Sequence, residues 1–326
     1  MHLVLNNFGT SIQRENGVFC IHTQDGKQLI FPDKIKSINI SKGAKISSDA
    51  VLLAIENEID VLFIDQTGSP AGRIWSHKYG SVSTIRKNQI EFVHSPQAVE
   101  CIKEIIIRKI DNQTALLLGI SEKPDDFISQ KTDKIIKRLE VYKSKIEAAK
   151  AELVHDIAPS LRGWEGAASK SYFEMLSEIM PPKMKFEKRS RQPANDIFNM
   201  LLNYGYGMLY GKVEGALIKA GIDPYLGVMH RDDYNRPVLA FDIIEIFRVW
   251  IDYVVVKLSI QEVIDEDCYS IQQEGYWLES QGKRILIQSV NDYLEEVIKM
   301  NGLERSRAVH IELYAQDLAQ KFLKFQ

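Results

Sequence analysis

Residues 194–224, ANDIFNMLLNYGYGMLYGKVEGALIKAGIDP, decide the fold of the larger part of this chain. Apolar side chains dominate the stretch at the spacing of a helix, and a glycine followed by Asp-Pro is a typical helix ending. We therefore predict one long apolar helix over residues 194–220 that ends at Gly221.

The helical pattern extends from this stretch in both directions. Downstream, another helix is predicted from about Val238, and the tail from Ser289 is predicted to be helical. Upstream, apolar residues recur at intervals of three and four through 98–110, 114–118 and 131–153. Residues 86–326 are thus predicted to form a large all-helical domain.

Residues 1–85 follow a different pattern, in which short apolar runs are separated by turn signals. One short helix is predicted over residues 48–58, where Ser and Asp precede apolar residues at helical spacing. The predicted strands are Leu3–Leu5, Val18–His22, Gln28–Phe31, Ser37–Ile40, Val61–Ile64 and Gly72–Ser76. The predicted fold class is α+β, with a small N-terminal β domain (1–85) before the larger helical domain (86–326).

The composition indicates a globular protein. With 326 residues, 45% of them hydrophobic and 26% charged, the chain can bury a sizeable core, and its length suits two domains better than one. The net charge of −3 excludes a uniformly basic surface. Any contact with nucleic acid is therefore expected to come from local clusters of Lys and Arg.

The three cysteines, Cys20, Cys101 and Cys268, have no spacing typical of a disulfide framework or a zinc site, which favours the reducing cytoplasm. The chain start has no basic region before its short apolar run, so we expect no signal peptide. No apolar stretch reaches the length of about 18 residues that a membrane span needs, and we expect no membrane partner.

Asp242 and Glu245 are three residues apart in the helix predicted from Val238, so their carboxylates share one face. A solvated stripe, or a pair between Glu245 and Arg248, explains this spacing equally well. His230 lies in a turn just upstream, where it either caps the turn or converges with the carboxylates on a metal ion. Histidine with carboxylate ligands fits Mg²⁺ or Mn²⁺ better than a thiolate zinc site.

Glu165 lies between Gly163 and Gly166 at the predicted start of a helix. The small neighbours would let a substrate or another backbone come close. An acidic residue in the first turn of a helix is equally well explained by the helix dipole.

Taken in order, these segments resemble the CRISPR-associated integrase family, the first-numbered Cas protein, which captures new spacers. The order and spacing of the elements from Glu165 to Arg248 carry most of the resemblance. The matching segments are Trp164-Glu165-Gly166, 191–196, 199–206, 220–230 and 239–248, with Gly72-Arg73 at the end of the β domain.

The resemblance implies that Glu165, His230 and Glu245 are catalytic ligands of a Mg²⁺ or Mn²⁺ ion, with Asp242 as the companion acid. It also implies a DNA endonuclease and integrase. The 3′-hydroxyl ends of short foreign DNA would be joined into the CRISPR repeat by transesterification. The implied partners are double-stranded DNA (protospacer and repeat), a second copy of the chain, and a small ferredoxin-like Cas protein, the second-numbered one. The β domain is expected to serve dimerisation and partner docking, and the helical domain catalysis.

Two other functions stay open at this point. The chain could be a metal-dependent nuclease that does not integrate, or a catalytically inactive DNA-binding scaffold. The presence of Glu165, His230 and Glu245 disfavours the scaffold.

A basic segment over residues 181–193, with three prolines, is predicted to be an exposed loop that contacts DNA phosphates. Its basic residues are Lys183, Lys185, Lys188, Arg189 and Arg191. The alternative is that an exposed loop collects Lys and Arg without function. Arg248 either contacts a phosphate or braces Glu245.

Overall fold

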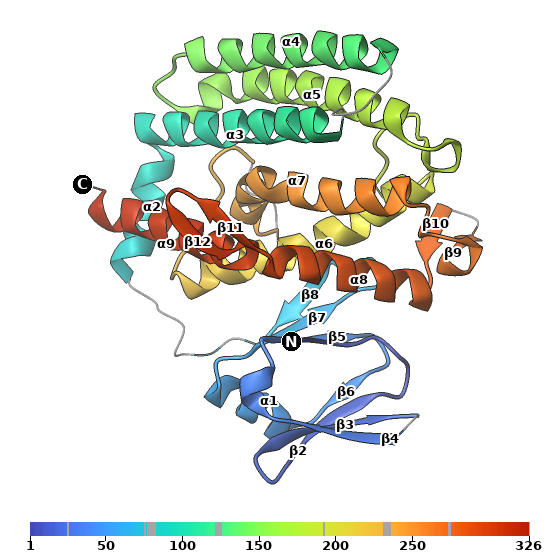
Figure 1. Ribbon diagram of the computed structural model, residues 1–326. Helices are drawn as coiled ribbons and strands as arrows, with labels where there is room; N and C mark the ends of the chain where they lie inside the picture. Colours follow the sequence, from blue (N-terminus) through green and yellow to red (C-terminus); the bar gives the residue numbers. More distant parts are fainter. Residues whose placement is uncertain are drawn as a thin grey trace.

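The N-terminal part of the chain contains two four-stranded sheets and one α-helix, and lies at one end of the molecule (Figure 1). The computed structural model describes residues 1–24, 26–74, 76, 83–120, 126–191, 193–230, 236–272 and 275–325. In the first sheet, β1 (His2–Leu5), β5 (Ser37–Ser41) and β7 (Asp60–Ile64) are parallel and β8 (Pro70–Arg73) is antiparallel to β7. In the second, the order is β4 (Gly26–Ile30), β3 (Val18–Thr23), β2 (Ser11–Glu15) and β6 (Lys45–Ile46).

The helix α1 (Ser48–Glu56) packs against both sheets, through β2 and β7. The predicted short helix is therefore confirmed, and the Ser47 hydroxyl caps its start by accepting from the Ala50 N–H at 3.2 Å. Strand β2 was not predicted, because Ile12 is the only apolar residue in it. Ile12 is nevertheless fully buried, and one such anchor suffices when the strand pairs on both sides.

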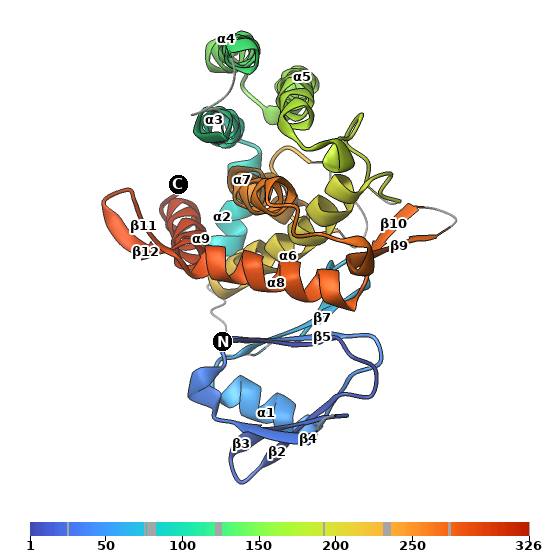
Figure 2. The same cartoon turned by 45° about the vertical axis from the view of Figure 1, so that its right-hand side comes forward.

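The rest of the chain is mainly helical, as predicted. Figures 1 and 2 show α3, α4 and α5 grouped as a bundle in which each helix packs against the other two, with α7 beneath α3. Helix α7 also packs against α6, so it lies at the centre of the helical part. The helices are α2 (Ser83–Val93), α3 (Pro96–Ile120), α4 (Asp126–Ala148), α5 (Val154–Ile179), α6 (Ile197–Lys219), α7 (Val238–Ile260), α8 (Ser280–Glu295) and α9 (Arg307–Lys324).

Helix α6 confirms the long helix predicted from residues 194–220. It starts three residues later, because the Asp196 carboxylate caps it by accepting from the Asn199 N–H at 2.7 Å. It ends as predicted before Gly221, which has a φ of +82°. A Cβ at Gly207 would lie 2.8 Å from the backbone carbon of Gly68, so the helix touches the N-terminal part backbone to backbone.

The predicted fold class is confirmed, with one addition and one correction. Two hairpins interrupt the helical part, β9 (Tyr269–Gln272) with β10 (Gly275–Leu278) and β11 (Val297–Met300) with β12 (Leu303–Ser306). The tail predicted to be helical from Ser289 is helical in α8 and α9, but the β11–β12 hairpin lies between them, so the prediction of an all-helical part over residues 86–326 is wrong at the two hairpins. Asn301 and Gly302, with φ of 52° and 79°, form the turn of the second hairpin, and Asn-Gly is a strong hairpin signal.

The last strand of the N-terminal part ends at Arg73, and the predicted domain boundary after residue 85 falls inside α2. Among the helices of the described ranges, none combines the length and the apolar character that crossing a membrane demands.

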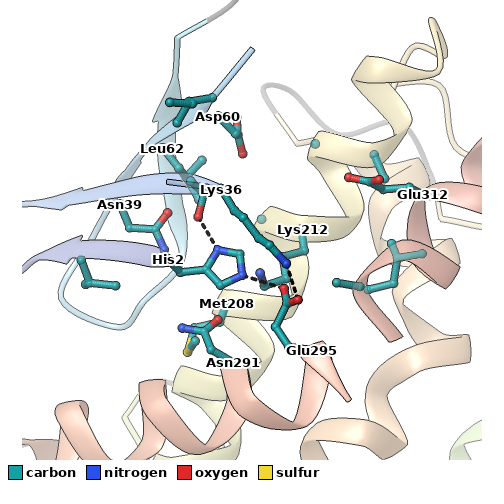
Figure 3. A pocket seen from close by; sticks show the side chains of 18 of the residues that line it. His2, Lys36, Asn39, Asp60, Leu62, Met208, Lys212, Asn291, Glu295 and Glu312 are labelled. Atoms are coloured by element: carbon teal, nitrogen blue, oxygen red, sulfur yellow. Dashed lines mark hydrogen bonds and ion pairs between the residues drawn. The ribbon is translucent and has the colours of Figure 1, made fainter. Parts of the chain in front are cut away.

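A cavity of about 360 Å³ lies between the N-terminal part and the helical part, and Figure 3 shows its side chains. His2 on β1 bonds Ser37 through Nδ1 at 2.8 Å and Glu295 of α8 through Nε2 at 3.1 Å. Lys36 contacts the same carboxylate, and Lys212 of α6 lies beside it. These polar contacts connect the two parts of the chain.

Burial, with a contribution from nearby Lys212 and the amino terminus, lowers the pKa of His2 to about 4. The unfolded chain, with an ordinary histidine pKa of 6.5, then binds more protons than the folded chain between pH 6.5 and 4. We expect His2 to lower the free energy of unfolding by about 1–2 kcal/mol between pH 7 and pH 5. Urea unfolding at both pH values measures this loss. In the His2→Gln variant the loss of unfolding free energy between pH 7 and pH 5 should be smaller by that amount. An equal loss in both proteins would show that His2 is not the group responsible.

Candidate active site

The four predicted site residues line a single cavity of about 550 Å³. Glu165 comes from α5, His230 from the loop before α7, and Asp242 and Glu245 from α7. Because α3 packs against both α5 and α7, the cavity lies where these three helices meet. The structure thus brings together residues that are 80 positions apart in the sequence.

Asp242 is completely buried and holds the loop that carries His230. Its Oδ2 accepts from the backbone N–H groups of Val228 at 2.7 Å and Met229 at 3.0 Å. Its Oδ1 accepts from the His230 N–H at 3.2 Å and contacts the His230 Nδ1 at 2.6 Å. The carboxylate therefore orients the imidazole and leaves Nε2 as the nitrogen available to another ligand.

The hydrogen bond to Asp242 raises the pKa of His230, and this effect outweighs the opposing effect of burial. The side chain of His230 is 40% exposed, whereas that of Asp242 is fully enclosed. The His230 imidazole therefore lies at the wall of the cavity, where the Asp242 carboxylate behind it fixes its orientation.

Glu245 is held between two cations. Its Oε1 lies 3.1 Å from Nη2 of Arg248, and its Oε2 lies 2.6 Å from Nζ of Lys109. Burial acts to raise the pKa of Glu245, but Arg248 and Lys109 outweigh it and lower this pKa to about 2. The helix pair with Arg248, one of the explanations left open by the sequence, therefore exists in the structure.

Glu165 lies near the middle of α5, so its prediction as a residue at a helix start is wrong. The helix begins at Val154 and continues through Pro159, which lies inside the helix and removes one backbone hydrogen bond. The helix-dipole explanation of Glu165 therefore does not apply. A Cβ at Gly163 or Gly166 would meet no heavy atom within 4 Å, and Gly166 lines the cavity, so the space beside Glu165 is open.

Lys109 of α3 was not predicted as a site residue. Its side chain is only 8% exposed, and its ammonium contacts Oε1 of Glu165 as well as Oε2 of Glu245. Ser169 also donates to Glu165 Oε1, at 2.9 Å. A lysine at helical spacing with Ile105 and Ile106 was the available signal, because a charge on an apolar helix face needs a buried partner.

A cluster of Tyr206, Tyr172 and Asp252, which was not predicted as part of the site, supports Arg248. The Arg248 guanidinium is 4.8 Å from the centroid of the Tyr206 ring. The buried Asp252 carboxylate accepts from the hydroxyls of Tyr206 and Tyr172, the latter at 2.8 Å. These contacts satisfy the buried polar groups and fix the ring on which Arg248 rests.

The basic segment is only partly exposed, which corrects its prediction as an exposed loop. Phe186 is buried and stacks on Phe198, with ring centroids 4.5 Å apart. Arg189 donates to the side-chain oxygens of Asn199 and Asn203 and so anchors the segment to α6. The segment belongs to the core as much as to the surface.

The basic side chains of this segment differ in where they lie. Lys188, Arg189 and Arg191 line the cavity of the four site residues, whereas Lys183 and Lys185 are not among its lining residues. Lys183 donates to the Ile264 carbonyl at 3.4 Å. Because Arg189 is engaged by the two asparagines, the exposed Lys188 and Arg191 are the residues of this segment placed to meet a ligand of the cavity.

The donor set of the cavity fits a hard divalent cation. Two carboxylates and one imidazole are suitable ligands for Mn²⁺ or Mg²⁺, and the oxygens of Glu165 and Glu245 already share a cation, the Lys109 ammonium. Across the described ranges, no three His, Cys, Asp or Glu side chains are arranged as they stand to hold a metal ion. A metal would therefore take the oxygens that Lys109 now contacts.

The class that this fold and site define is a protein in which a strand-rich N-terminal part precedes a helical part with a Glu-His-Asp-Glu cluster beside basic side chains. The family model for the CRISPR associated protein Cas1 matches residues 3–292. A relative from Archaeoglobus fulgidus, named CRISPR-associated endonuclease Cas1 1, is 31% identical over 98% of this chain and 95% of its own length. The chain belongs to the Cas1 family.

Two solved structures share the fold over the whole chain. A Cas1 protein from Thermotoga maritima has a TM-score of 0.82 at 21% identity, with 98% of that chain covered. A casposase bound to its integration product has a TM-score of 0.86 at 21% identity, with 91% of that chain covered. Family membership supports a CRISPR-associated nuclease or integrase.

Proposed function

We propose that this protein is a metal-dependent DNA integrase of CRISPR adaptation. It would join the 3′-hydroxyl ends of short foreign DNA fragments into the CRISPR repeat, and would also cut DNA when water replaces the hydroxyl. The observation that carries the proposal is the convergence of Glu165, His230 and Glu245 on one cavity that Lys188 and Arg191 also line. Membership of the Cas1 family supports the assignment to CRISPR.

The joining reaction exchanges one phosphodiester for another. The 3′-oxygen of the fragment attacks a phosphorus of the repeat and forms a new P–O bond. The bond from that phosphorus to the repeat's own 3′-oxygen breaks, and the proton lost by the attacking hydroxyl ends on the leaving oxygen. The step needs no other reactant, because one bond of the same kind forms for each that breaks.

A divalent metal bound by Glu165, His230 and Glu245 would activate the attacking hydroxyl and stabilise the charge that develops on the phosphate. The protein's own contribution is positional. Asp242 keeps the Nδ1 of His230 engaged, so that Nε2 can serve the site. Arg248 keeps Glu245 ionised, and Lys188 and Arg191 attract the DNA backbone.

We also propose the assembly in which the site works, a homodimer with double-stranded DNA and a small ferredoxin-like Cas partner. The strand-rich part would serve dimerisation and docking, and the helical part catalysis. The fold is shared with a solved Cas6-RT-Cas1–Cas2 complex, at a TM-score of 0.81 and 23% identity over 99% of this chain and 35% of that one. Three free buried cysteines suit the cytoplasm, where we place the protein.

One assay tests the proposal. The purified protein is incubated with a short DNA duplex that carries free 3′-hydroxyls, a plasmid with a CRISPR repeat, and Mn²⁺ or Mg²⁺, with and without the Cas partner. Product joined at the repeat, abolished by EDTA and by a dideoxy 3′ end, is the expected result. Cut DNA without joining supports a nuclease that does not integrate, and bound but unchanged DNA supports an inactive scaffold.

Removing the two exposed basic side chains at the cavity should weaken DNA binding. In the double variant Lys188→Ala/Arg191→Ala, we expect the dissociation constant for duplex DNA to rise about tenfold at moderate salt. The slope of log K against log salt should fall by roughly 2, because each lost phosphate contact accounts for about 0.9. Fluorescence anisotropy over a salt series measures both.

Lys183→Ala/Lys185→Ala is the matched control, because these lysines lie in the same segment and do not line the cavity. This variant should keep most of the affinity. Equal losses in the two double variants would mean that the segment acts only by its net charge.

A further inference from the structure

Lys109 is a buried cation at the centre of the site. It extends from the middle of α3, whose face toward α5 and α7 is otherwise largely apolar, and only 8% of its side chain is exposed. Its ammonium bridges a carboxylate oxygen from α5 and another from α7. Three helices are thus joined at one nitrogen atom.

The charges around this nitrogen are nearly balanced. Glu245 has a second cation, because Arg248 contacts its other oxygen at 3.1 Å. Glu165 has no other cation within 4 Å among the residues that the structure describes, and its remaining partner is the neutral Ser169 hydroxyl. Without Lys109, two partly buried carboxylates would lie close together with a single cation, Arg248, in contact with one of them. Such an arrangement is unfavourable in a medium of low polarity.

The position of the ammonium conflicts with a metal ion. A cation ligated by Glu165 and Glu245 needs the oxygens that Lys109 now contacts, and two cations at one oxygen pair repel each other strongly when partly buried. Lys109 also lines the cavity of the site, so its side chain has space to leave the carboxylates without leaving the site.

We infer that Lys109 is an internal counter-ion of the site, which holds Glu165 and Glu245 together before a metal binds and competes with the metal for their oxygens. The inference rests on the proposed function, because that proposal supplies the metal. Lys109 is therefore a positioning residue. Its role is to hold the two carboxylates close together while the site is empty of metal, at the expense of metal affinity.

The test measures metal binding and stability rather than activity. Mn²⁺ is titrated into the full-length protein by calorimetry, and the melting temperature is measured in EDTA and in saturating Mn²⁺. In Lys109→Met we expect tighter Mn²⁺ binding, by about tenfold, since removal of one nearby positive charge changes the interaction by about that factor. The melting temperature should fall in EDTA and recover in Mn²⁺.

Two further variants make the result specific. Lys103→Met is the matched control, because Lys103 is equally buried on the same helix and, among the described residues, forms an ion pair with Glu100 alone. It should not change Mn²⁺ binding. Lys109→Gln keeps a hydrogen-bond donor without the charge, and it should reproduce the tighter binding if Lys109→Met fails to fold.

The outcomes separate this inference from the proposed function. If the wild-type protein binds Mn²⁺ and the Lys109 variants bind it equally or more weakly, the competition is overturned and the proposed function stands. If only the Lys109 variants bind Mn²⁺, the competition is supported in its strongest form. If no protein binds Mn²⁺ at millimolar concentration, the metal dependence in the proposed function fails and the inference fails with it.

Discussion

Replacing His230 with alanine is expected to lower strand joining and strand cutting by roughly a thousandfold or more, while DNA binding is retained. If His230 holds the metal as we propose, its loss removes several kcal/mol of transition-state stabilisation, and each 1.4 kcal/mol corresponds to about a factor of ten in rate. The fold should persist, because the imidazole is 40% exposed and its loop stays bonded to Asp242 through Val228 and Met229.

The measurement is single-turnover joining and cleavage at saturating Mn²⁺, with anisotropy for DNA binding. His155→Ala is the control, because His155 is 76% exposed at the start of α5 and does not line the cavity. Activity of His230→Ala within tenfold of the wild type would contradict the assignment of this residue to the site.

Replacing Asp242 with alanine should damage both the loop and the chemistry. The change leaves three backbone N–H groups without their acceptor at a position that is completely buried. An unsatisfied buried donor costs about 1–3 kcal/mol, so we expect the free energy of unfolding to fall by about 3 kcal/mol or more. The released imidazole should also lower the joining rate by about 10- to 100-fold.

Denaturant unfolding and the joining assay measure these two losses. Asp242→Asn keeps one acceptor oxygen, so its loss of stability should be smaller than that of the alanine variant. Wild-type stability of Asp242→Ala would show that other groups, and not this carboxylate, hold the loop.

The class of the fold was within reach of the sequence because its signals are local. The apolar spacing from 194 to 220 and the ending at Gly221 need no knowledge of the rest of the molecule, and α6 forms there. Strand β2 shows the limit. It has a single apolar residue, Ile12, and it is stabilised by pairing with β3 and β6, partners that a local pattern does not specify. The β11–β12 hairpin is a different case, because its Asn301-Gly302 turn is a local signal that the prediction of a helical tail did not use.

The site shows the same division. The spacing of Asp242 and Glu245 predicts a shared helix face, and the ordered resemblance placed Glu165 and His230 with them. Lys109 was not predicted. Its role depends on its contacts with Glu165 of α5 and Glu245 of α7, and the sequence of α3 alone does not indicate these contacts. For Arg189 the prediction considered only its charge, whereas the structure surrounds it with Asn199 and Asn203.

The close approach of Gly207 to Gly68 has a consequence for how the two parts of the molecule respond to ionic strength. Backbone in contact with backbone is a steric restraint, and dissolved ions do not screen it. The angle between the strand-rich part and α6 should therefore stay nearly constant as salt rises, even while electrostatic attraction for DNA weakens. Scattering profiles that do not change over a salt series, beside a steep loss of DNA affinity, would be the signature of such a stiff joint.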